Sequence, residues 1–273
     1  MQLRLVSIHA FLFCLSVLLL SQAVFGQHSF TLNFEWTMQA KFIAADPLGK
    51  LYVVTPSNEL RQYAPDGSLL YKYNNNTLGE LTRVDATDPF QVMLYYNEYQ
   101  TVVILDRTLN LLSSINLWEF GIRQPLAPAM SNDNMLWVYD HADFRLRKLD
   151  RHGNPLHDSG DLNSLLNATP RPAEITARHN LVVLNDPNIG LLLFDNFGQY
   201  LETLPFPGCS QVQLPEPDRI LFYCNRRWKS YHIELRREVA FNLPSDMSPE
   251  AQIVAVGNYI FALHGDKIHC WSR

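Results

Sequence analysis

Aromatic and arginine side chains recur in the short polar segments that follow apolar stretches of this 273-residue chain. Side chains of these two kinds carry much of the binding energy at protein interfaces. The pattern therefore predicts a surface that recognises a partner. The alternative is that exposed loops carry tyrosine and arginine in any case, with the aromatic rings packed locally. The candidate binding residues are Tyr96, Tyr99, Trp118, Arg123, His141, Arg171, Arg226, Arg227 and Trp228.

Two carboxylates could do acid–base chemistry. Asp85 and Glu174 lie in weakly apolar segments that each precede a strongly apolar one. If they face each other, they could act as the acid and base of a hydrolase. The alternative is that both are solvated groups. The histidines show neither HxxxH nor HExxH spacing, and no Gly-x-Ser-x-Gly elbow or phosphate-binding glycine loop is present. We therefore predict no metal and no cofactor.

A repeated pattern of strands carries these residues. Apolar runs begin at intervals of about 40 residues, and each is followed by a polar turn, a second strand and a further short strand. A weaker strand precedes each apolar run. No stretch shows sustained apolar spacing of the helical kind, apart from a short segment at residues 162–168. The apolar runs begin at Leu51, Val92, Leu136, Leu181, Ile220 and Tyr259.

The two ends of the chain complement each other. The last repeat stops after its third strand at Trp271, and a spare alternating strand lies at residues 30–36. We expect this N-terminal strand to pair in the last blade and close the ring, which removes two exposed sheet edges. The predicted fold is all-β, a six-bladed β-propeller of four-stranded antiparallel blades. The alternative is a β-sandwich or an open array.

Residues 138–154, VYDHADFRLRKLDRHGN, resemble the NHL repeat. That repeat has an apolar strand, Asp, a short turn, Arg before an apolar residue, and a polar turn ending in Gly. Residues 64–68 and 195–199 resemble the same closing turn, while the second, fifth and sixth repeats match poorly. The chain is thus similar to six-bladed NHL-like and TolB-like β-propellers. These serve many functions, so the resemblance implies a fold and no particular activity.

Six-bladed lactonase-type propellers also resemble this fold, and they hold calcium at the inner ends of their first strands. That resemblance implies a metal-dependent hydrolase using Asp85 and Glu174 as the alternative function. Calcium needs about six to eight oxygen ligands, and these two residues are the acidic ones on the predicted inner strands. Two carboxylates make a sparse calcium site, so we expect a protein without catalytic activity.

In a propeller of this kind, the loops that join the apolar strand to the next strand of its blade share one face with the loops that join successive blades. That face would carry the candidate binding residues. We expect a binding or scaffold module that presents these loops to a protein, a peptide or a glycan. The formal net charge is −5 and no long basic run is present, so we predict no nucleic-acid partner.

Residues 1–26 read as a secretory signal peptide, with Arg4, an apolar run and a small-residue cleavage site before Gln27. The alternative is an uncleaved anchor. We expect one domain at residues 27–273, no membrane span after cleavage, and an extracytoplasmic location, periplasmic or secreted. Such compartments are oxidising.

Cleavage would remove Cys14 and leave three cysteines. A hairpin that turns through residues 215–218 would place Leu214 opposite Arg219, and therefore Cys209 opposite Cys224. Directly opposed strand residues are close enough for a disulfide, so we predict one between these cysteines, with Cys270 left buried. A register slip of one residue would instead leave two buried thiols.

Overall fold

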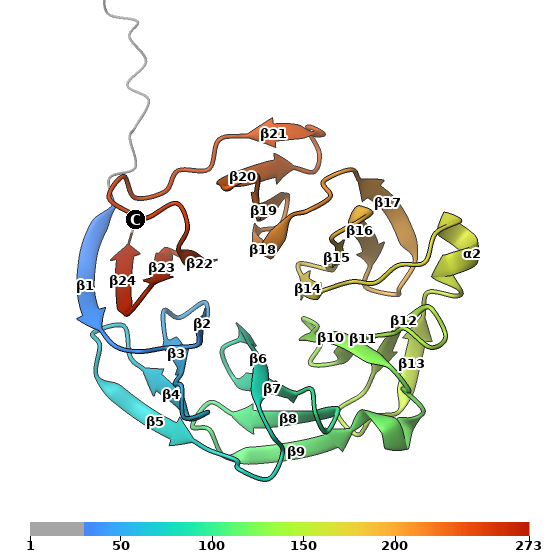
Figure 1. Cartoon of the computed structure of the whole chain (residues 1–273), viewed down its shortest axis with the longest axis horizontal. Coiled ribbons are helices and arrows are strands. Elements are labelled where there is room, and N and C mark those ends of the chain that lie inside the picture. The colour runs from blue at the N-terminus through green and yellow to red at the C-terminus, as the bar shows by residue number, and fades with distance from the viewer. Residues whose placement is uncertain (1–29, 273) are drawn as a thin grey trace, which may run out of the picture.

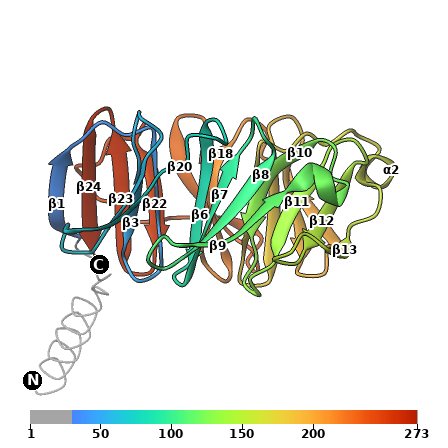
Figure 2. The ribbon, with the colours of Figure 1, turned by 90° about the horizontal axis from the view of Figure 1, so that it is seen from below.

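The computed structural model describes residues 30–272, which form six four-stranded antiparallel sheets around a central axis (Figure 1). Seen from the side, the molecule is a disc whose strands run between its two faces (Figure 2). The predicted six-bladed β-propeller is confirmed. The predicted signal peptide lies outside the described residues, so it and the domain boundary at residue 27 stay predictions.

The first three blades follow one another along the chain, each from its inner to its outer strand. Blade one holds β2 (Phe42–Ala45), β3 (Leu51–Val54), β4 (Leu60–Tyr63) and β5 (Leu69–Tyr73). Blade two holds β6 (Leu81–Asp88), β7 (Gln91–Tyr96), β8 (Thr101–Asp106) and β9 (Leu111–Asn116). Blade three holds β10 (Pro125–Met130), β11 (Leu136–Asp140), β12 (Arg145–Leu149) and β13 (Pro155–Asp158).

The next two blades keep the same order, and two short helices lie in connections between blades. Blade four holds β14 (Glu174–Arg178), β15 (Leu181–Asp186), β16 (Gly190–Asp195) and β17 (Tyr200–Leu204). Blade five holds β18 (Ser210–Glu216), β19 (Arg219–Cys224), β20 (Arg227–His232) and β21 (Arg237–Val239). The helices are the 3₁₀ turn η1 (Leu117–Phe120) and α2 (Leu162–Leu166), the latter within the segment expected to be helical.

The sixth blade joins the two ends of the chain, as predicted. It holds β22 (Gln252–Val256), β23 (Tyr259–His264), β24 (Lys267–Ser272) and, as its outer strand, β1 (Thr31–Thr37). Phe34 lies opposite Cys270 in the β1–β24 ladder. Because β1 covers the edge of β24, the last blade is as complete as the others, and the ring is closed by backbone hydrogen bonds.

The core consists of layers between neighbouring blades. On β11, Leu136 and Val138 pack toward blade two, whereas Trp137 and Tyr139 pack toward blade four. Successive side chains of a strand point to opposite sides of its sheet, so a strand buried on both sides must be apolar at every position. This explains the uninterrupted apolar runs that revealed the repeat.

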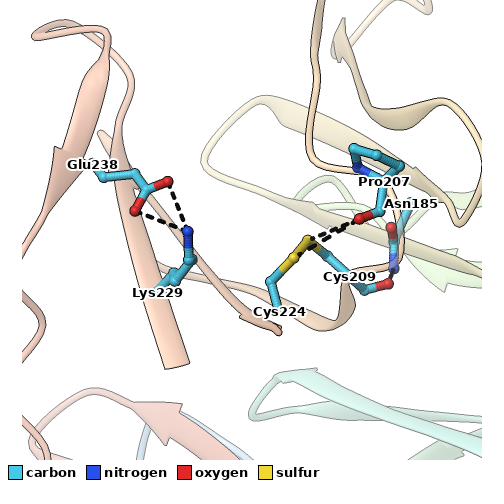
Figure 3. Close-up of a disulfide and its surroundings, with 6 residues drawn as sticks. All are labelled: Asn185, Pro207, Cys209, Cys224, Lys229 and Glu238. Atoms are coloured by element: carbon cyan, nitrogen blue, oxygen red, sulfur yellow. Dashed lines mark hydrogen bonds and ion pairs between the residues drawn. A yellow bond between two sulfur atoms is a disulfide. The ribbon is translucent and has the colours of Figure 1, made fainter. Parts of the chain in front are cut away.

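Cys209 and Cys224 form the predicted disulfide, with their Cα atoms 4.4 Å apart (Figure 3). The hairpin that carries them differs from the prediction, because Glu216, rather than Leu214, pairs with Arg219. Two irregularities along β18 then shift the register until Ser210 lies opposite Tyr223. Gln211, with φ of 53°, lies within the first irregularity. The two shifts together restore the register in which the cysteines face each other.

Cys270 is the free, buried cysteine. Within residues 30–272, no helix has both the length and the apolar character that crossing a membrane requires.

Candidate functional site

Strand direction decides which loops share a face. Because each sheet is antiparallel, the β7–β8 turn lies at the same end of the disc as the connection from β9 to β10, and the other blades repeat this arrangement. We call this end the loop face and the other end the opposite face; Figure 2 shows the disc between them. The loop face holds the segments in which the candidate binding residues were predicted.

Most of these candidates are exposed on the loop face, but Tyr96 is not. The side chains of Tyr99 and Trp118 are 56% and 63% exposed, and those of Arg123, Arg171 and Arg227 are also exposed. Tyr96 was placed in a loop, yet it is the last residue of β7 and fully buried between blades one and two. The prediction that Tyr96 is an exposed loop residue is therefore wrong. The alternation of β7 continues one residue further than predicted and turns this ring inward.

Four of the candidates gather over blades two and three. The Leu117 N–H donates to the Gln100 carbonyl oxygen at 3.0 Å, which holds η1 against the β7–β8 turn. The His141 N–H donates to the Gln124 carbonyl oxygen at 3.0 Å, which ties the β11–β12 turn to the loop that carries Arg123. We call Tyr99, Trp118, Arg123 and His141 the aromatic–arginine patch. Two adjacent blades thus supply the patch through directly bonded loops.

The helix η1 fixes the position of Trp118. Asn116 precedes the helix, and its side-chain oxygen accepts from the Trp118 N–H at 3.1 Å. Gly121 ends the helix in the left-handed conformation, with φ of 78°, and its N–H donates to the Trp118 carbonyl oxygen. Leu117 is fully buried between blades two and three. Both ends of η1 are capped and Leu117 is anchored in the core, so the backbone of Trp118 is held in place while its side chain is exposed to solvent.

Two buried aspartates anchor the loop face, and the sequence prediction missed them. Asp140 accepts hydrogen bonds from the N–H groups of Gln124 and Arg123, at 3.0 and 3.2 Å. Asp186 accepts likewise from the N–H group of Arg171. Each is the last residue of the apolar strand of its blade, so their repetition in blades three and four was the available signal. Each carboxylate holds the interblade loop in which a candidate arginine stands.

His141 belongs to the patch but is only partly accessible. Its ring lies 6.2 Å from that of Tyr139 and 5.4 Å from that of Phe144, measured between centroids. Its Nδ1 atom is buried and has no hydrogen-bond partner among the described residues. The imidazole therefore packs against the edge of the patch, while Tyr99 and Trp118 supply its exposed aromatic surface.

The candidates of blade five are separate from the patch. Arg226 is already paired with Glu250 in the connection to blade six. Trp228 is half-buried, lies 5.6 Å from the ring of Tyr223 and packs against the core between blades five and six. Its substitution would disturb packing as well as any contact with a partner. Arg227 remains as the freely exposed member of this group.

A cavity of about 390 Å³ occupies the central channel. Its walls come from the inner strands β2, β6, β14, β18 and β22, which surround the axis in Figure 1. Asp85 and Glu174, the predicted acid–base pair, both line it, together with Arg83 and Arg178. The sequence prediction placed the two carboxylates in the channel correctly and overlooked the two arginines.

Backbone N–H groups already engage both carboxylates. Asp85 Oδ2 accepts from the Met130 N–H at 2.9 Å, and its Oδ1 accepts from the N–H and hydroxyl of Thr87. Glu174 Oε2 accepts from the Val212 N–H at 2.9 Å, and burial raises the pKa of Glu174. Within residues 30–272, no group of three or more His, Cys, Asp or Glu side chains is arranged so that it could hold a metal ion.

These contacts belong to a wider set that joins the inner strands. The Ile43 N–H donates to Gln252 Oε1 at 3.0 Å, and Gln252 Nε2 donates to the Ile43 carbonyl oxygen at 3.1 Å. Gln213 contacts the next blade in the same way, through the Ile253 carbonyl oxygen and the Ala255 N–H. An inner strand has an unpaired edge, and side chains of the preceding blade satisfy it here.

Blade one has no such side chain on β2, and blade three departs from the arrangement as well. Its inner strand β10, with the sequence PLAPAM, has no side chain able to form a hydrogen bond with the edge of β14. Arg83 of blade two instead reaches across to the carbonyl oxygen of Ile175 in blade four. Asp85 and Glu174 are therefore, first of all, structural links between blades.

No protein-family model and no curated protein sequence matches this chain. Among solved structures, virginiamycin B lyase from Staphylococcus aureus matches with a TM-score of 0.65 at 13% identity, over 90% of this chain and 100% of that one. The Pan2 WD40 domain of Neurospora crassa gives 0.63 at 9% identity, over 89% and 95% of the two chains. A streptogramin B lyase gives 0.60 at 12% identity, over 89% and 97%. At such low identity these likenesses establish the propeller fold alone, and the likeness to NHL repeats stays an expectation.

Proposed function

We propose that this protein is a non-catalytic propeller that binds a protein or peptide through the aromatic–arginine patch on its loop face. The observation that carries the proposal is the exposure of Tyr99 and Trp118 on a capped and anchored framework. A rigid support lowers the entropy that a binding surface loses when it captures a partner. Arg123, exposed in the connection from η1 to blade three, adds a planar group of hydrogen-bond donors to the same face.

The alternative is a metal-dependent hydrolase that uses Asp85 and Glu174. It has less support, because the N–H groups of Met130 and Val212 already donate to these carboxylates. A general base must reach the proton that it removes, and a calcium ligand must offer free oxygen lone pairs. In either role the carboxylates would have to share their oxygens with the links between blades.

We further propose that the protein works outside the cytoplasm. The disulfide between Cys209 and Cys224 supports this, because such bonds persist in oxidising compartments. The apolar N-terminal segment gives the same indication from the sequence. A tagged chain expressed in its native host should appear in the periplasmic or culture fraction without residues 1–26, as mass spectrometry would establish.

The test of binding is quantitative affinity capture from extracts of the native host. The variant Tyr99→Ala/Trp118→Ala should lose its captured partner by about tenfold or more, the cost expected for truncating central aromatic contacts. The matched control is Phe90→Ala/Phe197→Ala, which removes two rings exposed to a similar degree, 63% and 62%, on the opposite face. Equal capture by both double variants and the parent would reject the patch as the binding surface.

A further inference from the structure

The channel contains two arginines whose charges are not matched by an ion pair. Most of the buried and half-buried lysine and arginine side chains of the described chain have a carboxylate within 4.0 Å, as Lys148 has Asp133 at 2.6 Å. Arg83 and Arg178 have no such partner among residues 30–272. Both line the central cavity of about 390 Å³. Asp85 and Glu174 line the same cavity and oppose these charges at longer range, but neither forms an ion pair with the arginines. A half-buried cation without a direct partner is costly, so this arrangement needs a physical account.

The hydrogen-bond donors of these arginines are largely unused. Arg83 donates from one terminal nitrogen to the Ile175 carbonyl oxygen, while its Nε atom is buried without a partner. No described residue accepts a hydrogen bond from the Arg178 side chain, and burial lowers its pKa. A guanidinium carries a planar fork of donors that matches a carboxylate or phosphate group.

The two carboxylates in the same cavity accept no hydrogen bond from these arginines. Asp85 acts on Arg178 through its charge, but the oxygens of Asp85 are engaged by Met130 and Thr87. Glu174 is likewise held by Val212. Both are directed into the links between blades, which leaves the arginine donors available to an acceptor from outside the chain.

The rest of the cavity suits an apolar group. Val84, Leu214, Ile253 and Val254 line it together with the polar side chains. Its volume lies within the usual range for small-molecule sites, which are mostly apolar with a few placed polar groups.

We propose that the central channel binds a small organic anion with a short apolar body, its carboxylate or phosphate group held by Arg178 and Arg83. This site is separate from the aromatic–arginine patch and does not depend on the function proposed for it. Carboxylates and phosphate monoesters share the required chemistry, and the experiment separates them.

The test is isothermal titration calorimetry of the purified mature chain at low ionic strength, with hexanoate, hexyl phosphate and the neutral hexan-1-ol as probes. One or both anions should bind and raise the melting temperature, whereas hexan-1-ol should not. Arg178→Met should weaken anion binding about tenfold or more, which is the loss expected for a charge-assisted hydrogen bond. Arg178→Lys keeps the charge without the fork and should bind with intermediate affinity.

Arg107→Met, which removes an exposed arginine of the β8–β9 turn on the opposite face, is the matched control and should bind as the parent does. The parent's preference for anions over hexan-1-ol tests the proposal even where Arg178→Met folds poorly. A response to hexanoate alone assigns a carboxylate, and a response to hexyl phosphate alone assigns a phosphate. Absence of binding by both anions, an equal response to hexan-1-ol, or unchanged binding by folded Arg178→Met would overturn the proposal.

Discussion

At the scale of single residues, burial decides what each polar or reactive group does. Tyr96 and Tyr99 are three positions apart, yet one fills the core and the other faces solvent. Asp140 and Asp143 differ in the same way within one turn, and the buried carboxylate orders the loop. The unpaired thiol of Cys270 is a third case, because burial raises its pKa to about 11.

Cys270 should not react with alkylating reagents in the native protein at pH 8. With a pKa of about 11, roughly one thiol in a thousand is ionised there, and the thiolate is the reacting form. Mass spectrometry of a chain expressed as residues 27–273 should count no alkyl groups in the native state, one after denaturation, and three after denaturation and reduction. Three groups without reduction would mean that the disulfide is absent.

Asp140→Asn should lower the free energy of unfolding by about 1–3 kcal/mol, because an amide NH₂ would then face backbone donors that need an acceptor. Urea denaturation measures this change. Asp143→Asn, on the exposed side of the same turn, is the control and should stay within about 0.5 kcal/mol of the parent. Equal effects of the two changes would show that Asp140 does not anchor the loop.

At the scale of strands and turns, the sequence was informative wherever side-chain burial imposes a period. The apolar runs revealed the blades because their strands are buried on both sides. The irregularities of β18 were not predictable, because they depend on local backbone angles such as that of Gln211. The aromatic–arginine patch was partly predictable from composition. Its anchor Asp140 was missed, because its role depends on hydrogen bonds to the loop 16 and 17 residues earlier, and the repetition of this aspartate in blade four was the one signal of it.

Gln213→Ala should lower the free energy of unfolding by about 1–3 kcal/mol. The change leaves the Ala255 N–H and the Ile253 carbonyl oxygen, now bonded at 2.8 and 2.6 Å, without partners at the channel wall. Thermal and urea unfolding measure it, with Gln199→Ala in an exposed turn of the opposite face as the control. If the two variants unfold alike, the side-chain links between inner strands do not stabilise the ring.

At the scale of the whole molecule, closure of the ring explains why distant ends of the chain act together. Phe34 and Trp36 of β1 pack in the core between blades six and one, and Glu35 pairs with Lys267 at 2.7 Å. The disc is held by six such layers and by one joint between its termini. Its rigidity is what would keep the patch and the channel in fixed positions.

A variant that begins at Met38 should melt at a lower temperature and form oligomers, because it lacks β1 and exposes the edge of β24. Light scattering after size-exclusion chromatography measures the oligomers. Glu35→Ala/Lys267→Ala removes the surface ion pair but keeps the strand, and should cost less than about 1 kcal/mol. A truncated chain that stays monomeric with the parent's melting temperature would contradict closure by β1.

The most direct test of the binding proposal is site-specific photocross-linking in the native host. A photoreactive residue is placed at Trp118 on the loop face or at Phe197 on the opposite face, two rings of nearly equal exposure. We predict one defined cross-linked protein or peptide from position 118, absent from position 197, and lost when Tyr99→Ala is added. Cross-linking only from position 197, or none from position 118 in the presence of the captured partner, would contradict the account.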